Sequence, residues 1–429
     1  MHYVTASGRT GFVRHTCSPG LALAIVLTFT IIAGQTAKGQ TYTVIHDFTG
    51  GGDGLYPYTG LTIDAAGNLY GTTIYGGSGG SGVIFKLRRG GSGWVFTPIY
   101  SFTGGTDGAV PQGRVAIAAD GTLYGTTSAG GSHPCDCGTV FHLRPQPYAP
   151  RSALTPWNET VIYSFSGVDG NLPQGDLTFD AAGNIYGTTV GGGLFNWGAI
   201  YKLTPSGGGW TQSVLYSAQD DSNGVEPHGG VVLDDSGNLY GVFQFARGSA
   251  GTVFELSPSG SGWIEQTVYG FTGIGNNGGD EPIGGLILDA AGNLFGTTLY
   301  GGTFPPGGIA FQLTPGGGGW TYQTIYSFLN GDGGPEDKLM MDGAGNLYGT
   351  AFSAGAFDWG SVFKLTPSPG GWTMTALHDF CPDNFPCADG ARPMSNVVMD
   401  AQGNLYGTTT QGGAFGNGVV WQIAETGVP

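Results

Sequence analysis

The sequence predicts an all-β fold, a seven-bladed β-propeller with four antiparallel strands in each blade. Glycine accounts for 85 of the 429 residues, about a fifth of the chain against a usual share of roughly 7%. Aromatic residues make up 12% and hydrophobic residues 40%, which excludes a collagen-like or disordered chain. A motif also recurs seven times with a spacing of 53 to 62 residues, as in propellers.

The recurring motif is Gly-Asn-Leu-Tyr-Gly-Thr-Thr, first seen at residues 67–73. The inner-strand repeats that contain it lie near 57–73, 111–127, 173–189, 227–243, 282–298, 335–351 and 393–409. In the third copy, glycine and proline signals separate four strand-like runs at 173–180, 184–189, 198–204 and 210–217. We name these runs A to D in chain order. They are apolar on both sides, as a blade packed between two neighbours requires.

The ends of the repeat region predict that the ring closes. An isolated D-type strand at 42–48 precedes the first motif, and the last copy stops after its C strand at 418–424. A solenoid has a similar period, but pairing of these two segments would complete the last blade and remove its open edge. The predicted propeller then spans residues 40–429 as one domain.

The turn between strands A and B carries an aspartate followed by Gly-Asn. Asp can hydrogen-bond the turn backbone, and Gly can adopt a positive φ. Six copies have this Asp, at 64, 180, 234, 289, 342 and 400, whereas the second copy uses Asp120-Gly121. A calcium loop is the alternative, but a tight turn needs the same residues, so we favour a structural role.

The first 39 residues have the order of a secretory signal peptide. Arg9 and Arg14 precede an apolar run at 21–33, and small residues follow near Ala37. The run is shorter than the roughly 20 residues that a spanning helix needs. We therefore expect a cleaved signal, no membrane span after its removal, and a secreted, periplasmic or cell-surface protein.

The charge of the chain argues against binding to nucleic acid. The whole sequence has a net charge of −16, and loss of residues 1–39 removes three of 14 bases and none of 30 acids, which gives −19. Such a field repels phosphate backbones and anionic lipid surfaces. It either keeps the protein soluble outside the cell or attracts cations.

Four cysteines remain after residue 39, and an exported protein would use them in local disulfides. Cys381 and Cys387 enclose five residues, whereas Cys135 and Cys137 enclose only one, where a bridge is strained. His133 precedes Cys135 by two residues, so a His-x-Cys-x-Cys metal site is the alternative. It lacks a fourth ligand.

The repeated strings Gly-Asn-Leu-Tyr-Gly-Thr-Thr, Val-Phe-Lys-Leu-Thr-Pro, Gly-Gly-Trp-Thr and Leu-Tyr-Ser-Phe resemble the GloVer repeat proteins named from Gloeobacter and Verrucomicrobia. The resemblance covers nearly all of residues 41–424. It implies an extracytoplasmic bacterial repeat protein with no assigned activity. Members often end in a sorting or anchoring segment; we see none here, which favours release.

In the predicted ring, the D–A and B–C loops open on one face and the A–B and C–D turns on the other. The first face collects Asp-Gly pairs, which offer a ring of possible ligand-binding carboxylates at Asp53, Asp107, Asp169, Asp332 and Asp389. Such a ring could hold Ca²⁺. Asp-Gly is also the commonest sequence of a tight loop, so a purely structural role is the alternative. Trp197 and Trp359, in matching Phe-x-Trp-Gly strings, are candidates for stacking on sugars.

Signals of an enzyme are few. The sequence has no Gly-x-Ser-x-Gly, His-Glu-x-x-His or phosphate-loop motif. His46 and His378 replace Tyr in D strands and are interpreted as packing variants. Glu226 and His228, near the predicted channel, are the best candidates for acid or base chemistry, although we favour no catalytic role.

Three functional hypotheses follow. The first is a monomeric binding module for an extracellular glycan or protein that uses the D–A and B–C loops. The second is a structural surface protein whose repeats build a rigid disc. The third is a hydrolase or lyase with a metal at the channel mouth. The fold does not decide between them, since propellers support all three.

Overall fold

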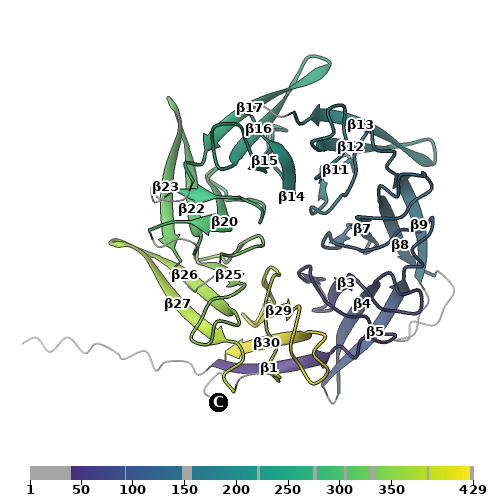
Figure 1. The fold of residues 1–429 in the computed structure, drawn as a ribbon, viewed down its shortest axis with the longest axis vertical. Helices are drawn as coiled ribbons and strands as arrows, with labels where there is room; N and C mark the ends of the chain where they lie inside the picture. The colour runs from purple at the N-terminus through teal and green to yellow at the C-terminus, as the bar shows by residue number, and fades with distance from the viewer. Residues whose placement is uncertain are drawn as a thin grey trace, which may run out of the picture. The chain divides into compact units, whose positions relative to one another are not determined.

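The computed structural model describes residues 40–91, 93–146, 157–219, 223–273, 278–303, 307–328, 334–383 and 386–425. They lie within one compact unit, Gly39–Pro429. Every regular element among them is a β-strand, and seven four-stranded antiparallel sheets form a ring around a central axis (Figure 1). The prediction of a seven-bladed propeller is confirmed. The predicted signal peptide lies outside the described residues.

The first four blades follow the chain order A, B, C, D. Blade 1 contains β2 (Thr62–Ile63), β3 (Leu69–Thr73), β4 (Val83–Gly90) and β5 (Gly93–Ser101). Blade 2 contains β6 (Ala116–Ile117), β7 (Leu123–Thr127), β8 (Thr139–Pro145) and β9 (Trp157–Ser164). Blade 3 contains β10 (Thr178–Phe179), β11 (Ile185–Thr189), β12 (Ala199–Ser206) and β13 (Gly209–Ser217). Blade 4 contains β14 (Val225–Leu233), β15 (Leu239–Phe245), β16 (Thr252–Ser259) and β17 (Gly262–Gly270).

Blades 5 and 6 keep the same order, and blade 7 borrows its last strand. Blade 5 contains β19 (Ile287–Leu288), β20 (Leu294–Thr298), β22 (Ile309–Gly316) and β23 (Gly319–Ser327), beside a small ladder of β18 (Gly279–Asp280) and β21 (Tyr300–Gly301). Blade 6 contains β24 (Met340–Met341), β25 (Leu347–Ala351), β26 (Ser361–Ser368) and β27 (Gly371–Asp379). Blade 7 contains β28 (Val398–Met399), β29 (Leu405–Thr409), β30 (Val419–Glu425) and β1 (Gln40–Asp47).

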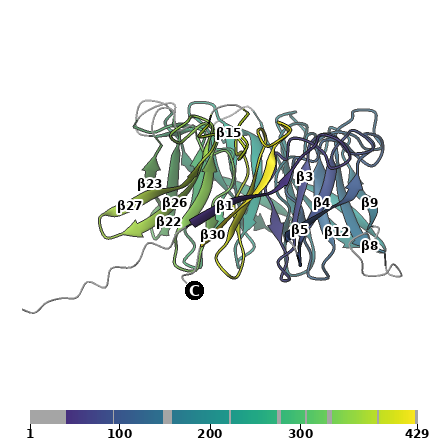
Figure 2. The ribbon, with the colours of Figure 1, turned by 90° about the horizontal axis from the view of Figure 1, so that it is seen from below.

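Strand β1 closes the ring by pairing antiparallel with β30. Its register runs from Gln40 opposite Glu425 to Asp47 opposite Val419, with a bulge between Val44 and His46. In every other blade the outer strand has a bulge at the equivalent position. β1 therefore takes the place of a D strand, as the sequence predicted, and the two ends of the repeat region lie side by side (Figures 1 and 2).

The repeated motif builds the turn between strands A and B and the start of strand B. One oxygen of Asp64 accepts hydrogen bonds from the backbone N–H groups of Ala66 and Asn68, both at 2.9 Å. The other accepts from the Asn68 side chain at 2.7 Å and from the Tyr70 hydroxyl at 3.1 Å. The same bonds recur at Asp180, Asp234, Asp342 and Asp400. These aspartates thus have the structural role we favoured.

The blades lock together through aromatic pairs near the turns between strands C and D. In blades 1 to 6, the tryptophan near the start of the D strand packs edge-on against the strand-B aromatic residue of the preceding blade. The pairs are Trp157 with Tyr70, Trp210 with Tyr124, Trp263 with Tyr186, Trp320 with Tyr240, Trp372 with Phe295, and Trp94 with Tyr406. Such pairs add about 0.5–1.5 kcal/mol each beyond the area they bury.

Strand A is shorter than the sequence predicted. We expected it to span 173–180 in the third copy, but β10 contains only Thr178 and Phe179. Pro173 has no N–H to donate to a ladder. A Cβ on Gly175 would lie 2.4 Å from the backbone nitrogen of Gly230 in the next blade. This segment therefore packs along the channel instead of pairing within its own sheet.

Candidate functional site

The loops between strands D and A and between strands B and C gather at one edge of the ring (Figure 2). We call this surface the loop face; in blade 1 it comprises residues 48–61 and 74–82. Isolated bridges join the two loops of a blade, for example between Leu55 and Tyr75 and between Asn171 and Gly191. The A–B and C–D turns form the opposite surface, the turn face.

The loop-face aspartates use their carboxylates within their own loops. Asp107 accepts hydrogen bonds from the Thr103 backbone N–H at 2.8 Å, the Thr103 hydroxyl at 2.6 Å and the Tyr100 hydroxyl at 3.0 Å. Asp169 accepts from the Ser166 backbone N–H at 2.8 Å and from the Tyr163 hydroxyl. Burial raises the pKa of Asp107, but the hydrogen bonds that it accepts outweigh burial, and its pKa lies below the ordinary value. These bonds fix the loop conformation.

Asp53 and Asp389 have the same role but bond to histidine. The His46 ring lies 3.2 Å from Asp53 and the His378 ring 2.9 Å from Asp389, measured between nitrogen and oxygen. Each histidine also stacks on an aromatic ring, His46 on Phe96 and His378 on Tyr42. Both histidines thus occupy the position of Tyr100 and Tyr163, in keeping with a packing role.

The aspartates belong to separate blades and do not converge. Among the residues described, no group of three or more His, Cys, Asp and Glu side chains is placed to hold a metal ion. Asp332 lies outside the described residues. Instead, each described carboxylate of the Asp-Gly pairs accepts hydrogen bonds within its own D–A loop and the strand before it.

Exposed aromatic side chains gather on the loop face. In the described part of the chain, the aromatic residues with at least about a third of their surface exposed are Tyr56, Tyr75, Phe195, Trp197, Phe245, Tyr300, Phe357 and Phe415. All eight belong to D–A or B–C loops or to the strand ends beside them. The turn face and the outer strands expose aliphatic residues instead, such as Val95, Val214 and Ile264.

The two tryptophans in matching sequence positions have different environments. Trp197 is 41% exposed at the tip of the blade 3 B–C loop. Trp359 is half-buried against Cys381 and Cys387, and the Arg392 guanidinium lies 5.0 Å from its ring centroid. Trp197 therefore presents its ring to solvent, while Trp359 supports the loop beneath Arg392.

Both cysteine pairs form disulfides. One joins Cys381 to Cys387 and the other joins Cys135 to Cys137. Each lies in a loop of the loop face, and the sulfur-bearing side chains of Cys137, Cys381 and Cys387 are buried. With its cysteines paired, the loop after His133 has no thiolates for the alternative His-x-Cys-x-Cys metal site.

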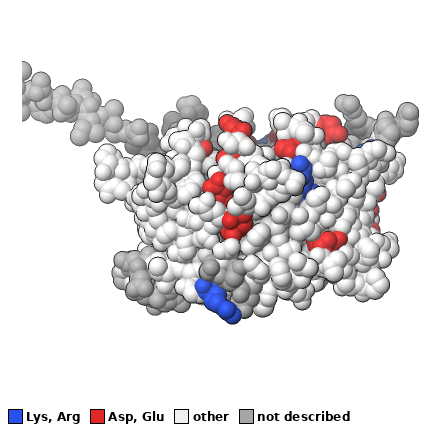
Figure 3. Space-filling model, turned by 90° about the horizontal axis from the view of Figure 1, so that it is seen from above, with Lys and Arg blue, Asp and Glu red and all other residues white. Residues whose placement is uncertain are grey.

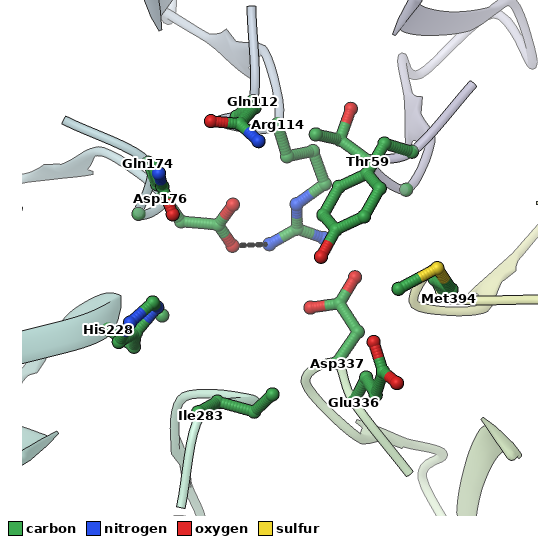
Figure 4. Close-up of a pocket in the computed structure, with 14 residues that line it drawn as sticks. Thr59, Gln112, Arg114, Gln174, Asp176, His228, Ile283, Glu336, Asp337 and Met394 are labelled. Carbon is green, nitrogen blue, oxygen red and sulfur yellow. Dashed lines mark hydrogen bonds and ion pairs between the residues drawn. The ribbon is translucent and has the colours of Figure 1, made fainter. Parts of the chain in front are cut away.

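A cavity of about 120 Å³ lies on the propeller axis near the loop face. All seven blades contribute to it, chiefly through the residues that follow the first proline of each repeat (Figure 4). His228 lines this cavity, and burial lowers its pKa to about 4, opposed by a hydrogen bond with Gln244. Glu226 does not line it; its backbone N–H donates to the carbonyl of Trp197 on the loop face. The two candidates for acid or base chemistry therefore do not share one site.

Charged side chains that sequence reasoning missed meet in this cavity. Arg114 of blade 2 forms an ion pair with Asp176 of blade 3 at 2.5 Å (Figure 4). Asp337 of blade 6 points toward them and accepts hydrogen bonds from the backbone N–H groups of Lys338 and Asn396, both at 2.6 Å. Burial and the charge of Asp176 raise the pKa of Asp337 to about 6.

Glu336 adds a further carboxyl group to the cavity. Burial, followed by the charge of Asp337, raises the pKa of Glu336 to about 7. The signal that could have found Glu336 and Asp337 is the segment Pro335-Glu336-Asp337-Lys338, because no other copy has an acidic residue at either of the two positions after this proline. At neutral pH this cavity is polar and carries charges of both signs.

On the side of the ring seen in Figure 3, charged side chains are few and scattered, and the acidic ones outnumber the basic ones. No helix in the described ranges is long and apolar enough to cross a membrane.

The fold and the repeats define a class, the β-propeller repeat proteins. Three successive matches to the model of the Gloeobacter/Verrucomicrobia repeat cover residues 30–153, 152–334 and 305–428. The chain belongs to this family. This confirms the resemblance carried by the Gly-Asn-Leu-Tyr repeats.

Solved structures share the fold at low identity. A protein from Lactobacillus plantarum has a TM-score of 0.52 at 14% identity, over 83% of this chain and 99% of that one. PorZ, an essential bacterial surface component of the type-IX secretion system of Porphyromonas gingivalis, has a TM-score of 0.51 at 13% identity, over 85% of this chain and 46% of PorZ. A putative 6-phosphogluconolactonase from Bacteroides uniformis has a TM-score of 0.49 at 14% identity, over 79% of this chain and 88% of that one. A comparison with curated proteins finds no match.

Proposed function

We propose that this protein is an exported binding module that takes an extracellular glycan on its loop face. The observation that carries the proposal is the location of the exposed aromatic side chains, which all lie on that face in the described part of the chain. An aromatic ring beside polar groups suits a sugar ring, because it offers a flat apolar surface while neighbouring groups bond the hydroxyls.

Blade 3 provides the best-formed part of this surface. Trp197 and Phe195 flank Asn196 in one B–C loop, and Leu194 in the same loop is 76% exposed. Val168 in the adjoining D–A loop is also 76% exposed. Exposed apolar clusters rimmed by polar residues mark interaction sites. We place the centre of the glycan site at Trp197.

Two features support a location outside the cytoplasm. The chain forms two disulfides, which persist in oxidising compartments. Residues 1–39 carry the pattern of a secretory signal. We therefore propose that residues 40–429 are released after cleavage and act outside the cytoplasm, in the periplasm, at the cell surface or in the medium.

The test is a glycan array probed with the protein expressed from residue 40, followed by titration of the best ligand. Trp197→Ala should weaken binding at least ten-fold, because it removes the most exposed indole without opening the core. Ile264→Ala, an exposed change on an outer strand, is the matched control and should bind as wild type does. Trp359→Ala needs a parallel melting curve, because this half-buried side chain also packs against the disulfide.

Other outcomes favour the remaining hypotheses. Glycan binding that both tryptophan variants leave intact counts against this surface. Absence of any glycan ligand together with capture of a defined protein on the loop face would favour a protein partner. Loss of binding on addition of a chelator would show a Ca²⁺ requirement. Turnover that Glu226→Gln or His228→Ala abolishes would favour the hydrolase or lyase. Absence of any ligand, partner or turnover would favour the structural surface protein.

A further inference from the structure

The seven repeats agree at their turns and differ at the channel axis. The third residue after the first proline of each repeat is Gly60, Arg114, Asp176, Gly230, Gly285, Lys338 or Asn396 in successive blades. Those of blades 1, 2 and 3 line the axial cavity. Only 11 bases follow residue 39, and two of them occupy this one structural position. Closure of the ring does not require a charged residue at this position, because four of the seven blades have Gly or Asn there. The departure from repetition therefore marks the axis as a place of specific chemistry.

A second cavity, of about 320 Å³, lies on the turn-face side of the axial cavity already described. Arg114 lines both cavities. The second cavity is lined by Lys338 and by the inner strands β19, β24 and β28 with the residues that precede the last two. Of the described residues that line it, Arg114 and Lys338 are the charged ones, and none is an aspartate or glutamate.

Lys338 has no direct counter-ion among the residues that the structure describes. Within the described ranges, no hydrogen bond or ion pair reaches its ammonium group, whereas Arg114 is held by Asp176 at 2.5 Å. Asp176 and Asp337 act on Lys338 only through the longer-range Coulomb interaction. Enclosure in the channel lowers the pKa of Lys338, and the nearby Arg114 charge opposes the attraction of the two carboxylates. An anion between the two bases would relieve this repulsion.

The wall of the second cavity beside the bases is formed by apolar residues of blades 5, 6 and 7. In blades 5 and 6 the first residues of strand A are Ile287 and Met340, both partly exposed. In blades 1 and 3 the same position is Thr62 and Thr178, whose hydroxyls donate to backbone carbonyls of the next blade. The second cavity thus offers two basic side chains next to a wall of apolar residues.

We infer that the turn-face end of the channel binds a small amphipathic carboxylate, with its carboxylate between Arg114 and Lys338 and its hydrocarbon chain along Ile287, Met340 and Met341. A carboxylate suits the site because it can accept from a guanidinium and an ammonium at once. The hydrocarbon chain of the ligand would be removed from water where it contacts the apolar wall, which favours binding. This site lies away from the loop face and does not depend on the glycan proposal.

The test is isothermal titration calorimetry of the folded protein with octanoate. We expect saturable binding with one octanoate per protein, and no binding of 1-octanol, which has the same chain without the charge. Lys338→Gln should weaken octanoate binding at least ten-fold, and Lys338→Arg should retain it. Lys364→Gln, in the same blade but on β26, is the matched control and should bind octanoate as wild type does.

A second variant keeps the proposal testable if Lys338→Gln fails to fold. Met340→Thr copies the residue found in blades 1 and 3 and removes part of the apolar wall, so it should weaken octanoate more than acetate. Melting curves establish that each variant is folded. Failure of octanoate to bind wild type, equal binding of 1-octanol, or unchanged binding by folded Lys338→Gln overturns the inference.

Discussion

The Tyr42 ring of β1 lies flat on the His378 ring of β27, with ring centroids 3.8 Å apart and the planes 7° from parallel. The Tyr42 hydroxyl also donates to the backbone carbonyl of Asp389, whose carboxylate bonds His378. The closing strand is therefore fastened twice, by its ladder to β30 and by this side chain to the preceding blade. Burial and the charge of Asp389 raise the pKa of Tyr42 well above its usual value, so the hydroxyl stays a donor.

Loss of this closure should weaken the whole ring. Deletion of residues 40–48 removes the fourth strand of blade 7 and exposes the edge of β30, so we expect a sharply lower melting temperature and aggregation. Tyr42→Ala should cost about 2–4 kcal/mol of unfolding free energy, the usual range for a large core side chain. Calorimetry and light scattering measure both effects. Thr43→Ala on the exposed side of β1 is the control, and a deletion variant that melts like wild type would contradict the closure.

The glycine in the middle of strand B should tolerate no side chain. A Cβ on Gly71 would lie 2.5 Å from the Phe85 ring and 2.9 Å from Leu61. Gly71→Ala should therefore destabilise the protein by about 1–3 kcal/mol, as overpacking does. Gly52→Ala is the control, because a Cβ there meets nothing within 4 Å. Denaturant titration of both variants gives the comparison, and equal midpoints would show that the blade can yield at Gly71.

The sequence was informative where a feature repeats and uninformative where it occurs once. Six copies of the Asp64-type turn and seven copies of the Gly71-type glycine made the blade, its strand order and its closure predictable. Arg114 and Asp176 each occur in one copy, and they meet only because the ring brings blades 2 and 3 together at the axis. The pattern also treated Trp197 and Trp359 alike, because their difference depends on what the neighbouring loop places over each ring.

The axial carboxyl group of Glu336 should make stability depend on pH. Its folded pKa of about 7 lies above the ordinary value of 4.5, chiefly because of burial. The folded state then binds the proton more tightly than the unfolded state, so this group lowers stability as pH rises from about 4.5 to 7. Glu336→Gln should remove that loss and be more stable than wild type at pH 8, by on the order of 1–2 kcal/mol.

The measurement is the unfolding free energy of wild type and Glu336→Gln at pH 5 and pH 8. The gap between the two proteins should widen at the higher pH. Asp107, whose pKa is lowered by hydrogen bonds from Thr103, provides the opposite control. Its contribution to stability is present above its unfolded pKa and is lost as pH falls through its folded pKa, so Asp107→Asn should matter more at pH 8 than at pH 3. A Glu336→Gln gap that stays constant with pH contradicts the assignment.

The Cys381–Cys387 disulfide should stabilise the fold more than the Cys135–Cys137 disulfide does. The first closes a longer loop, with a sequence separation of six residues against two, and its two side chains are almost fully buried beside Trp359. The loop-entropy estimate for so short a loop is roughly 2 kcal/mol. The Cys381→Ala, Cys387→Ala double variant should lose about that much unfolding free energy and expose Trp359, visible as a shift in its fluorescence. Alanine is chosen because a serine hydroxyl at these buried positions would add its own cost.

The Cys135→Ala, Cys137→Ala double variant is the comparison and should lose less unfolding free energy. An equal or greater loss in this variant would assign the stabilising role to the Cys135–Cys137 loop.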